Sequence, residues 1–174
     1  QKADQKISYK LFSGPEGMIL HPDGTVSWTP TPLQVDTVKY AIIASHGVAT
    51  DSQYVSLFVN HPPVIKNAPN IMNTISVGGI WDFEIDVYDP NKNDPLVFTA
   101  NKLPPGMRMD PHSGFLRWEP TMNELDFHKL EIEISDGHES RIIESEFFVN
   151  SPIDIVSVPS MSATVGEEYN YPLI

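Results

Sequence analysis

Oxygen-bearing side chains gather in one short segment of the sequence, DVYDPNKND, which runs from Asp86 to Asp94. Asp86, Asp89, Asn91 and Asp94 place three carboxylates and one amide within a single turn-forming stretch. Calcium prefers such oxygen ligands and takes about six to eight of them. An ordinary solvated turn has the same composition, so the segment is either a calcium-binding loop or an exposed acidic turn.

Side chains that could support catalysis lack the spacing that catalysis needs. No histidine pair has the HExxH spacing of a helical zinc site, and the chain has no cysteine to complete one. His138 and Glu139 are neighbours, but no nucleophile motif or second acid accompanies them. The six histidines are His21, His46, His61, His112, His128 and His138. We therefore predict that the protein is not an enzyme; a hydrolase would need paired carboxylates or a Ser–His arrangement.

The charge balance limits the possible partners. The 174 residues include 11 Lys and Arg against 23 Asp and Glu, for a formal net charge of -12. A nucleic-acid backbone or an anionic membrane would be repelled. The absence of cysteine excludes a disulfide framework. No apolar run approaches the roughly 20 residues of a membrane helix, so we expect any signal or anchor to lie outside this segment.

The chain repeats itself. The segment PEGMILHPDGTVSWTPT, which ends at Thr31, aligns with PPGMRMDPHSGFLRWEPT, which ends at Thr121. Gly17 and Gly106 lie 89 residues apart, and Trp28 and Trp118 lie 90 residues apart. That period is typical of a small β-sandwich domain. The shared position of Trp28 and Trp118, just after an alternating segment, predicts that both rings plug the end of a core.

The residue pattern within the period is that of strands. Acidic residues alternate with apolar ones from Ile80 to Val87, and Leu130, Ile132 and Ile134 alternate with glutamates. Turn-forming clusters such as DPHSG and SDGHES separate these runs, and the chain has 16 prolines and ten glycines. No stretch shows the apolar period of an amphipathic helix. The sequence therefore predicts an all-β fold.

Several of these motifs occur together in one known family. LPPGM, a DxxxG turn, W-E-P-T and a closing SDG resemble the dystroglycan-type cadherin-like and immunoglobulin-like tandem repeats of surface proteins. The resemblance implies tandem sandwiches of about seven strands each. It also implies an extracellular or cell-surface location and a role as a spacer or adhesive module.

The same resemblance assigns a calcium site. The acidic loop is similar to the loop with which cadherin-like repeats hold calcium between domains, which implies Asp89, Asn91 and Asp94 as ligands, with Asp136 as the corresponding late aspartate. The first copy departs from this pattern, because His46 stands where the second copy has Asp136.

Three domains are predicted from the repeat. Residues 1–61 form a first repeat that lacks its N-terminal strands, residues 62–151 form a complete second repeat, and residues 152–174 begin a third. The start of the third repeat is indicated by Val165 and Leu173, which match Val77 and Ile85 at a spacing of 88 residues.

The predicted function is a structural or adhesive module whose partners are other copies or neighbouring repeats. The segment 152–174 resembles the piece that the first repeat lacks, so it could complete the first repeat of another molecule by strand addition and build a fibre. Alternatively, the chain is one window of a longer array whose neighbouring residues complete both ends. A third hypothesis is glycan binding, which would require coplanar exposed aromatic rings.

Overall fold

The protein is described by a computed structural model that covers residues 6–153 and 156–173. Residues 1–5 of the predicted first repeat, and residues 154, 155 and 174 of the predicted third, lie outside this description. The fold is all-β, as predicted. One short 3-10 helix, η1 (Met122–Glu124), is present in the described ranges, and no helix there is long and apolar enough to cross a membrane.

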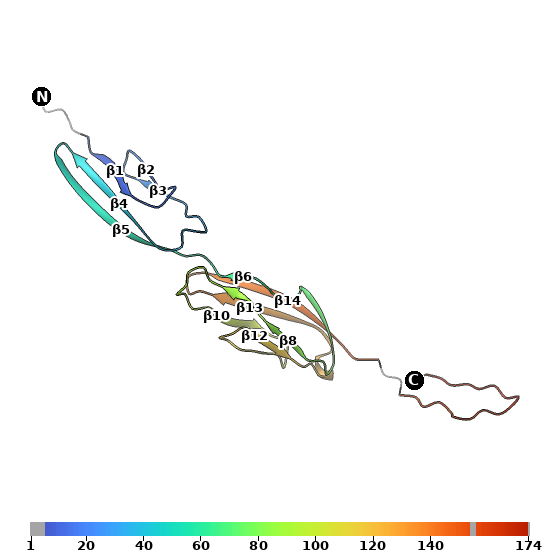
Figure 1. The fold of residues 1–174 in the computed structure, drawn as a ribbon. Coiled ribbons are helices and arrows are strands. Elements are labelled where there is room, and N and C mark those ends of the chain that lie inside the picture. The colour runs from blue at the N-terminus through green and yellow to red at the C-terminus, as the bar shows by residue number, and fades with distance from the viewer. Residues whose placement is uncertain (1–5, 154–155, 174) are drawn as a thin grey trace.

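The strands form two groups that lie end to end (Figure 1). The first group is β1 (Ser8–Ser13), β2 (Ile19–Leu20), β3 (Val26–Ser27), β4 (Asp36–His46) and β5 (Ala49–Val59). The second group is β6 (Val64–Ile65), β7 (Met72–Ser76), β8 (Trp81–Glu84), β9 (Val87–Tyr88), β10 (Val97–Lys102), β11 (Arg108–Met109), β12 (Phe115–Trp118), β13 (Asp126–Ser135) and β14 (Ser140–Asn150).

The second group is a complete sandwich. One sheet has the order β10-β13-β14-β7 and the other has the order β11-β12-β8, while β6 and β9 form a separate short pair. All neighbours are antiparallel except β14 and β7, which run parallel.

The core of this sandwich confirms the predicted alternation. Leu130, Ile132 and Ile134 of β13 have exposed fractions of 1%, 0% and 0%. Phe147 of β14 is equally buried. Trp118 is 1% exposed, and its indole N–H donates to the Pro105 carbonyl at 2.9 Å. The ring is fully buried and its indole N–H is hydrogen-bonded, so Trp118 stabilises the core without leaving a polar atom unpaired.

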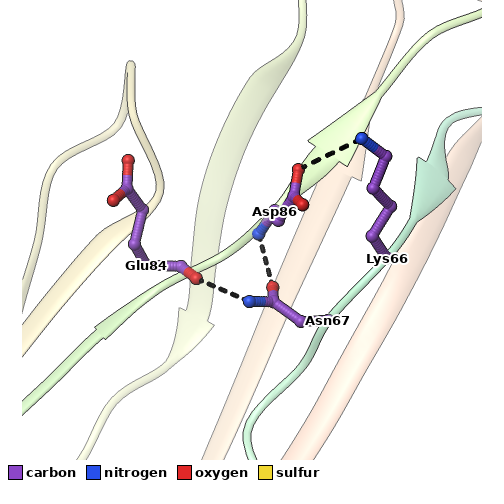
Figure 2. Close-up of polar contacts among 4 residues, drawn as sticks. All are labelled: Lys66, Asn67, Glu84 and Asp86. Atoms are coloured by element: carbon purple, nitrogen blue, oxygen red, sulfur yellow. Dashed lines mark hydrogen bonds and ion pairs between the residues drawn. The ribbon is translucent and has the colours of Figure 1, made fainter.

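The strand expected from Ile80 to Val87 is broken, and the reason is a side chain of the preceding segment. The Asn67 amide donates to the Glu84 carbonyl at 3.2 Å and accepts from the Asp86 N–H (Figure 2). A side-chain amide thus replaces ladder bonds where β8 ends, while Ile85 turns into the core at 3% exposure. This break and the short pieces β6 and β11 give nine strands where about seven are predicted.

The first group repeats the second one in part. Its sheets are β1-β4-β5 and β2-β3, and the bulge between Leu11 and Ser13 matches the bulge between Ala100 and Lys102. The Trp28 indole N–H donates to the Glu16 carbonyl at 3.1 Å, and the Trp118 indole N–H donates to the equivalent Pro105 carbonyl in the second repeat.

The described part of the first group has no counterpart of β7 or β8. Its apolar residues are consequently more exposed than their equivalents. Leu57 is 42% exposed, whereas the equivalent Phe147 is 0% exposed. Trp28 is only half-buried, so the prediction of a core position for it is wrong in this arrangement, because the strand that would cover it is missing.

The tail after the second group is extended, and its described residues form no strand. One turn nevertheless repeats the second sandwich. The Glu167 N–H donates to Thr164 O at 3.1 Å, as the Gly79 N–H donates to Ser76 O at 2.9 Å. The glycine of each turn has a positive φ, 88° for Gly166 and 74° for its equivalent. The backbone therefore supports the register in which the tail matches the segment that contains β7 and β8.

Candidate functional site: the junction between the repeats

The loop between β9 and β10 places Asn91 at the boundary between the two repeats. Its side chain is 1% exposed. The Asn91 Nδ2 group donates to Asp36 Oδ1 and to the Val59 carbonyl, both at 2.9 Å. Its Oδ1 accepts from the His61 N–H at 2.7 Å. One side chain of the second repeat is thus bonded to the start of β4, the end of β5 and the linker.

A second set of contacts crosses the same boundary. The Asn60 Nδ2 group donates to Asp136 Oδ2 at 2.9 Å. Asp136 is 3% exposed, and its Oδ1 accepts from the N–H groups of His138 and Glu139 at 2.7 and 2.6 Å. The His138 ring lies 5.0 Å from the ring of Phe58, at an interplanar angle of 40°. Hydrogen bonds and one aromatic contact therefore link the repeats on two sides.

Local chain chemistry holds both loops in shape. The Asn91 N–H donates to Asp89 Oδ1 at 2.7 Å, which closes a turn of the kind that aspartate favours. In the other loop, Gly137 has a φ of 90°, a conformation that costs glycine little. The linker contains the adjacent prolines Pro62 and Pro63, whose rings fix φ. The polar groups of the junction are thus held by short, rigid segments.

The pKa values of two junction carboxylates, Asp89 and Asp136, are shifted in opposite directions. Burial, reinforced by the negative charges of Asp136 and Asp94, raises the pKa of Asp89 above its ordinary value. Burial alone would also raise the pKa of Asp136. Hydrogen bonds from Glu139, Asn60 and His138 outweigh burial there and lower the pKa of Asp136. Of these two carboxylates, Asp89 is the one whose charged form the protein disfavours.

Three oxygen atoms at the junction are buried without a hydrogen-bond partner in the structure: Asn60 Oδ1, Asp89 Oδ2 and Asp94 Oδ2. Such atoms are acceptors only, so a cation or a donor would satisfy them. No three carboxylate or imidazole groups in residues 6–153 and 156–173 are arranged to hold a metal by themselves. An ion at this place would need amide and backbone oxygens as well, which calcium accepts.

The predicted calcium ligands lie together at the junction, but their side chains make different interactions. Asp89, Asn91 and Asp94 share one loop, in which the Asp94 N–H donates to Asn91 O at 3.2 Å, and Asp136 acts electrostatically on Asp89. The Asn91 side chain already bonds three groups of the first repeat and the linker. Its assignment as a calcium ligand stays a prediction, and its observed role is that of a bridge.

Asp86 lies apart from the other members of the acidic segment. Its carboxylate is 3.8 Å from Lys66 Nζ, beside the Asn67 amide (Figure 2).

Two junction residues were not predicted as functional residues from the sequence, namely Asp36, which was not singled out, and Asn60, which was noted only as a repeat and linker position. A signal for them exists in the repeat, since each has an identical residue 90 positions later, Asp126 and Asn150.

Aromatic rings of the second repeat do not form an exposed platform at Trp81. Its ring stacks on Phe83 at 5.6 Å and 6°, and it packs edge-on against the buried Phe147 at 4.8 Å. Trp81 thus lies against the core, on the apolar face of the alternation that runs from Ile80 to Val87. Glycan binding remains a prediction without a matching surface at this strand.

Comparisons with known proteins give the fold. No family model matches the chain, and no curated protein matches it. Among solved structures, Sidekick-1 immunoglobulin domains 1–4 align with 83% of the chain at 17% identity and a TM-score of 0.53. The likeness shows tandem immunoglobulin-like sandwiches. The chain spans 40% of that structure.

Two further structures align at lower TM-scores. Human protocadherin-24 EC1-2 aligns with 87% of the chain at 16% identity and a TM-score of 0.46, and 85% of that structure is covered. An endo-fucoidan hydrolase from glycoside hydrolase family 107 aligns with 86% of the chain at 16% identity and a TM-score of 0.41. The chain spans only 24% of that enzyme.

Proposed function

We propose that the chain is a non-enzymatic structural and adhesive segment of an extracellular or cell-surface protein, in which sandwich repeats are held in line by polar junctions. The observation that carries this proposal is the bridge made by Asn91, whose three hydrogen bonds all reach the first repeat or the linker. Buried hydrogen bonds of this kind fix an orientation, because any other orientation leaves the same groups unpaired. A fixed orientation suits a spacer that must transmit position or force.

The test is whether the two repeats tumble as one body. Residual dipolar couplings measured separately for residues 8–59 and 64–150 should yield one common alignment tensor, since a stiff junction prevents independent motion. Two different tensors would overturn the proposal of an in-line, rigid module.

Calcium forms a second part of the proposal. Asn60, Asp89 and Asp94 would hold the ion through their unpartnered oxygens, together with Asp136. When bound, calcium would neutralise the repulsion among these carboxylates and tighten the junction. This would couple the stiffness of the module to the calcium concentration outside the cell.

The calcium proposal is tested by calorimetric titration and by thermal melting with and without calcium. The double substitution Asp89→Ala and Asp94→Ala should abolish the binding heat and the stabilisation. Asp86→Ala serves as the matched control, because Asp86 belongs to the same acidic segment but faces Lys66. Calcium stabilisation that survives the double substitution would place the ion elsewhere.

Strand complementation forms the third part. In the second repeat, β7 runs beside β14 and β8 runs beside β12. The equivalent edges of β5 and β3 are uncovered in the described residues, and Leu57 remains 42% exposed. The segment 156–173 has the register of β7 and β8, so the tail of one molecule would complete the first repeat of the next. Repetition of this contact builds an open fibre.

The register of this contact can be tested by disulfide trapping, because the chain has no cysteine of its own. Arg117 lies opposite Asp82 in the second repeat, so the matching pair between molecules is Ser27 and Asn170. Chains carrying Ser27→Cys, mixed with chains carrying Asn170→Cys, should form disulfide-linked dimers under mild oxidation. Glu168→Cys, two residues out of register, is the matched control. Equal trapping at both positions would reject strand complementation.

A further inference from the structure

We propose that the far end of the second repeat is a docking surface for another in-line repeat, built from Asp126, Phe148 and Asn150. The inference rests on the proposed function, since it assumes that the observed junction is a working contact. It adds a second site, at the opposite end of the complete sandwich, and it specifies the partner by the side chains that the partner must present.

The first observation is backbone conformation. Asp36 and Asp126 are the two non-glycine residues with positive φ in the described ranges, at 65° and 98°. They lie 90 residues apart and begin the equivalent strands β4 and β13. Each is opposite the equivalent valine, Val59 or Val149. Few non-glycine residues adopt a positive φ, although aspartate does so more readily than most, and unusual backbone conformations cluster at functional sites such as ligand clamps and switch regions.

In the first repeat, the residue with this conformation contacts the following repeat. The backbone of Asp36 aims its carboxylate at the Asn91 amide of the following repeat, at 2.9 Å. In the second repeat the same conformation is kept, but Asp126 is exposed and its carboxylate has no hydrogen-bond or ion-pair partner within residues 6–153 and 156–173. Asp126 therefore has the unusual backbone conformation of Asp36 but lacks the hydrogen bond that Asp36 makes to the following repeat.

Aromatic residues at this end repeat the same relation. Phe58 contacts the His138 ring of the following repeat. Its equivalent, Phe148, has no such neighbour and packs instead on Phe127, with ring centroids 4.8 Å apart. Phe127 is 61% exposed. An exposed ring, Phe127, and a half-buried ring, Phe148, thus lie at the place where the first repeat contacts the next one.

The third element is an asparagine with a free donor. Asn150 is the equivalent of Asn60, whose Nδ2 group donates to Asp136 of the following repeat. The Oδ1 atom of Asn150 accepts from Ser76 Oγ at 3.0 Å, which fixes the amide plane. Its Nδ2 group has no partner in the described part of the chain. The donor is therefore oriented and available for a carboxylate of the Asp136 type.

These three elements define the occupant. It is a repeat that presents an amide in the position of Asn91 and an Asp-Gly-His turn in the position of residues 136–138. The near end of the first repeat does not qualify, because it has His46 and Val48 where the second repeat has Asp136 and His138. The full set of contacts therefore needs a following repeat of the 62–150 type, joined through the linker that begins at Asn150. A repeat completed by strand addition from a second copy would present His46 and Val48 there and would lack the Asp136 contact.

The test uses a chain in which residues 151–174 are replaced by a second copy of residues 61–150. Asn150 is then joined directly to a second His61, and both junctions have the same partners. The added copy is isotope-labelled by ligation, so that its amide signals are read separately. The measurement is hydrogen exchange at the two His61 amides.

The expected result is protection of the second His61 amide within about threefold of the first. Asp126→Ala should accelerate exchange of the second amide about tenfold or more and leave the first unchanged. Asp126→Gly, which suits a φ of 98°, should also lose the protection while preserving the melting temperature of the second repeat. Asn123→Ala, exposed at the same end of the repeat, is the control and should change neither amide.

The outcomes separate the two proposals. If the first His61 amide is unprotected, the in-line junction itself fails. If the first is protected and the second exchanges freely, or if the second stays protected in Asp126→Ala, the junction stands and the docking surface proposed here is refuted.

Discussion

Replacement of Asn91 by alanine is expected to open the junction and leave the second sandwich folded. The side chain makes three hydrogen bonds, two from Nδ2 and one to Oδ1, and all three partners belong to the first repeat or the linker. The core of the second repeat does not include this residue. The loss should therefore fall on the contact between the repeats.

The size of the effect follows from those bonds. The two bonds to backbone groups contribute about 1 kcal/mol each and the bond to the Asp36 carboxylate at least as much, so the three together amount to at least about 3 kcal/mol. The cost is increased by the Val59 carbonyl, which belongs to a residue only 8% exposed and would lose a partner. A loss of about 3 kcal/mol corresponds to roughly a hundredfold change in the opening equilibrium.

Hydrogen exchange at the His61 amide measures this directly, because that N–H donates to Asn91 Oδ1. Exchange should accelerate about a hundredfold in Asn91→Ala. The free energy of unfolding of the second repeat, followed by the amide signals of β13, should change by less than about 1 kcal/mol, since β13 contributes to the separate core of that repeat. Asn93→Ala is the matched control, because Asn93 is an exposed residue of the same loop. An unchanged His61 rate, or an equal loss of stability in the second repeat, would refute the reasoning.

Three other predictions concern the core, a turn and the acidic loop. Trp118→Ala should cost the second repeat about 3 to 5 kcal/mol in chemical denaturation, whereas the half-buried Trp28 should cost the first repeat less when replaced in the same way. Gly114→Ala should destabilise more than Gly137→Ala in thermal melting, because the new Cβ would lie 2.5 Å from an aromatic ring of β10 in the first case and meet nothing within 4 Å in the second. Asp89→Asn should stabilise the calcium-free protein at neutral pH. Because the folded-state pKa of Asp89 is raised, the native protein gains stability as pH falls through that pKa, and melting curves of the variant should lack this gain.

The parts of the fold that depend on local pattern could be predicted from the sequence. The alternation of Leu130, Ile132 and Ile134 with glutamates specifies which face of β13 is buried, and burial follows it closely. Glycine in turns was equally readable, since Gly114 has a φ of 70°. An alternation of period 2 indicates that one face of a strand is buried, and this holds whichever way the strands are connected.

The parts that depend on a distant partner could not be predicted. The break after Glu84 arises because Asn67, 17 residues earlier, supplies an amide that replaces ladder bonds. The role of Asn91 depends on Asp36, which is 55 residues away in another repeat. Composition identified the loop as a source of oxygen ligands, but only the fold shows that one of its amides is already occupied as a donor. Side-chain hydrogen bonds across a domain boundary leave no alternating pattern within a strand, and their trace in this sequence is the recurrence of Asp36 and Asn60 after 90 residues.

A polar junction also explains why the repeats meet at one angle. The hydrophobic effect is non-directional, so an apolar contact constrains the relative rotation of two surfaces less than a hydrogen bond does. The contact between Asn91 and the Val59 carbonyl constrains it more, since a shift leaves a buried donor and a buried acceptor unpaired. Acidic residues on both sides, Asp36 and Asp136, are each matched by an asparagine amide from the opposite repeat. Two reciprocal amide–carboxylate pairs constrain rotation as well as distance, and their first-repeat members recur at Asp126 and Asn150 of the second repeat.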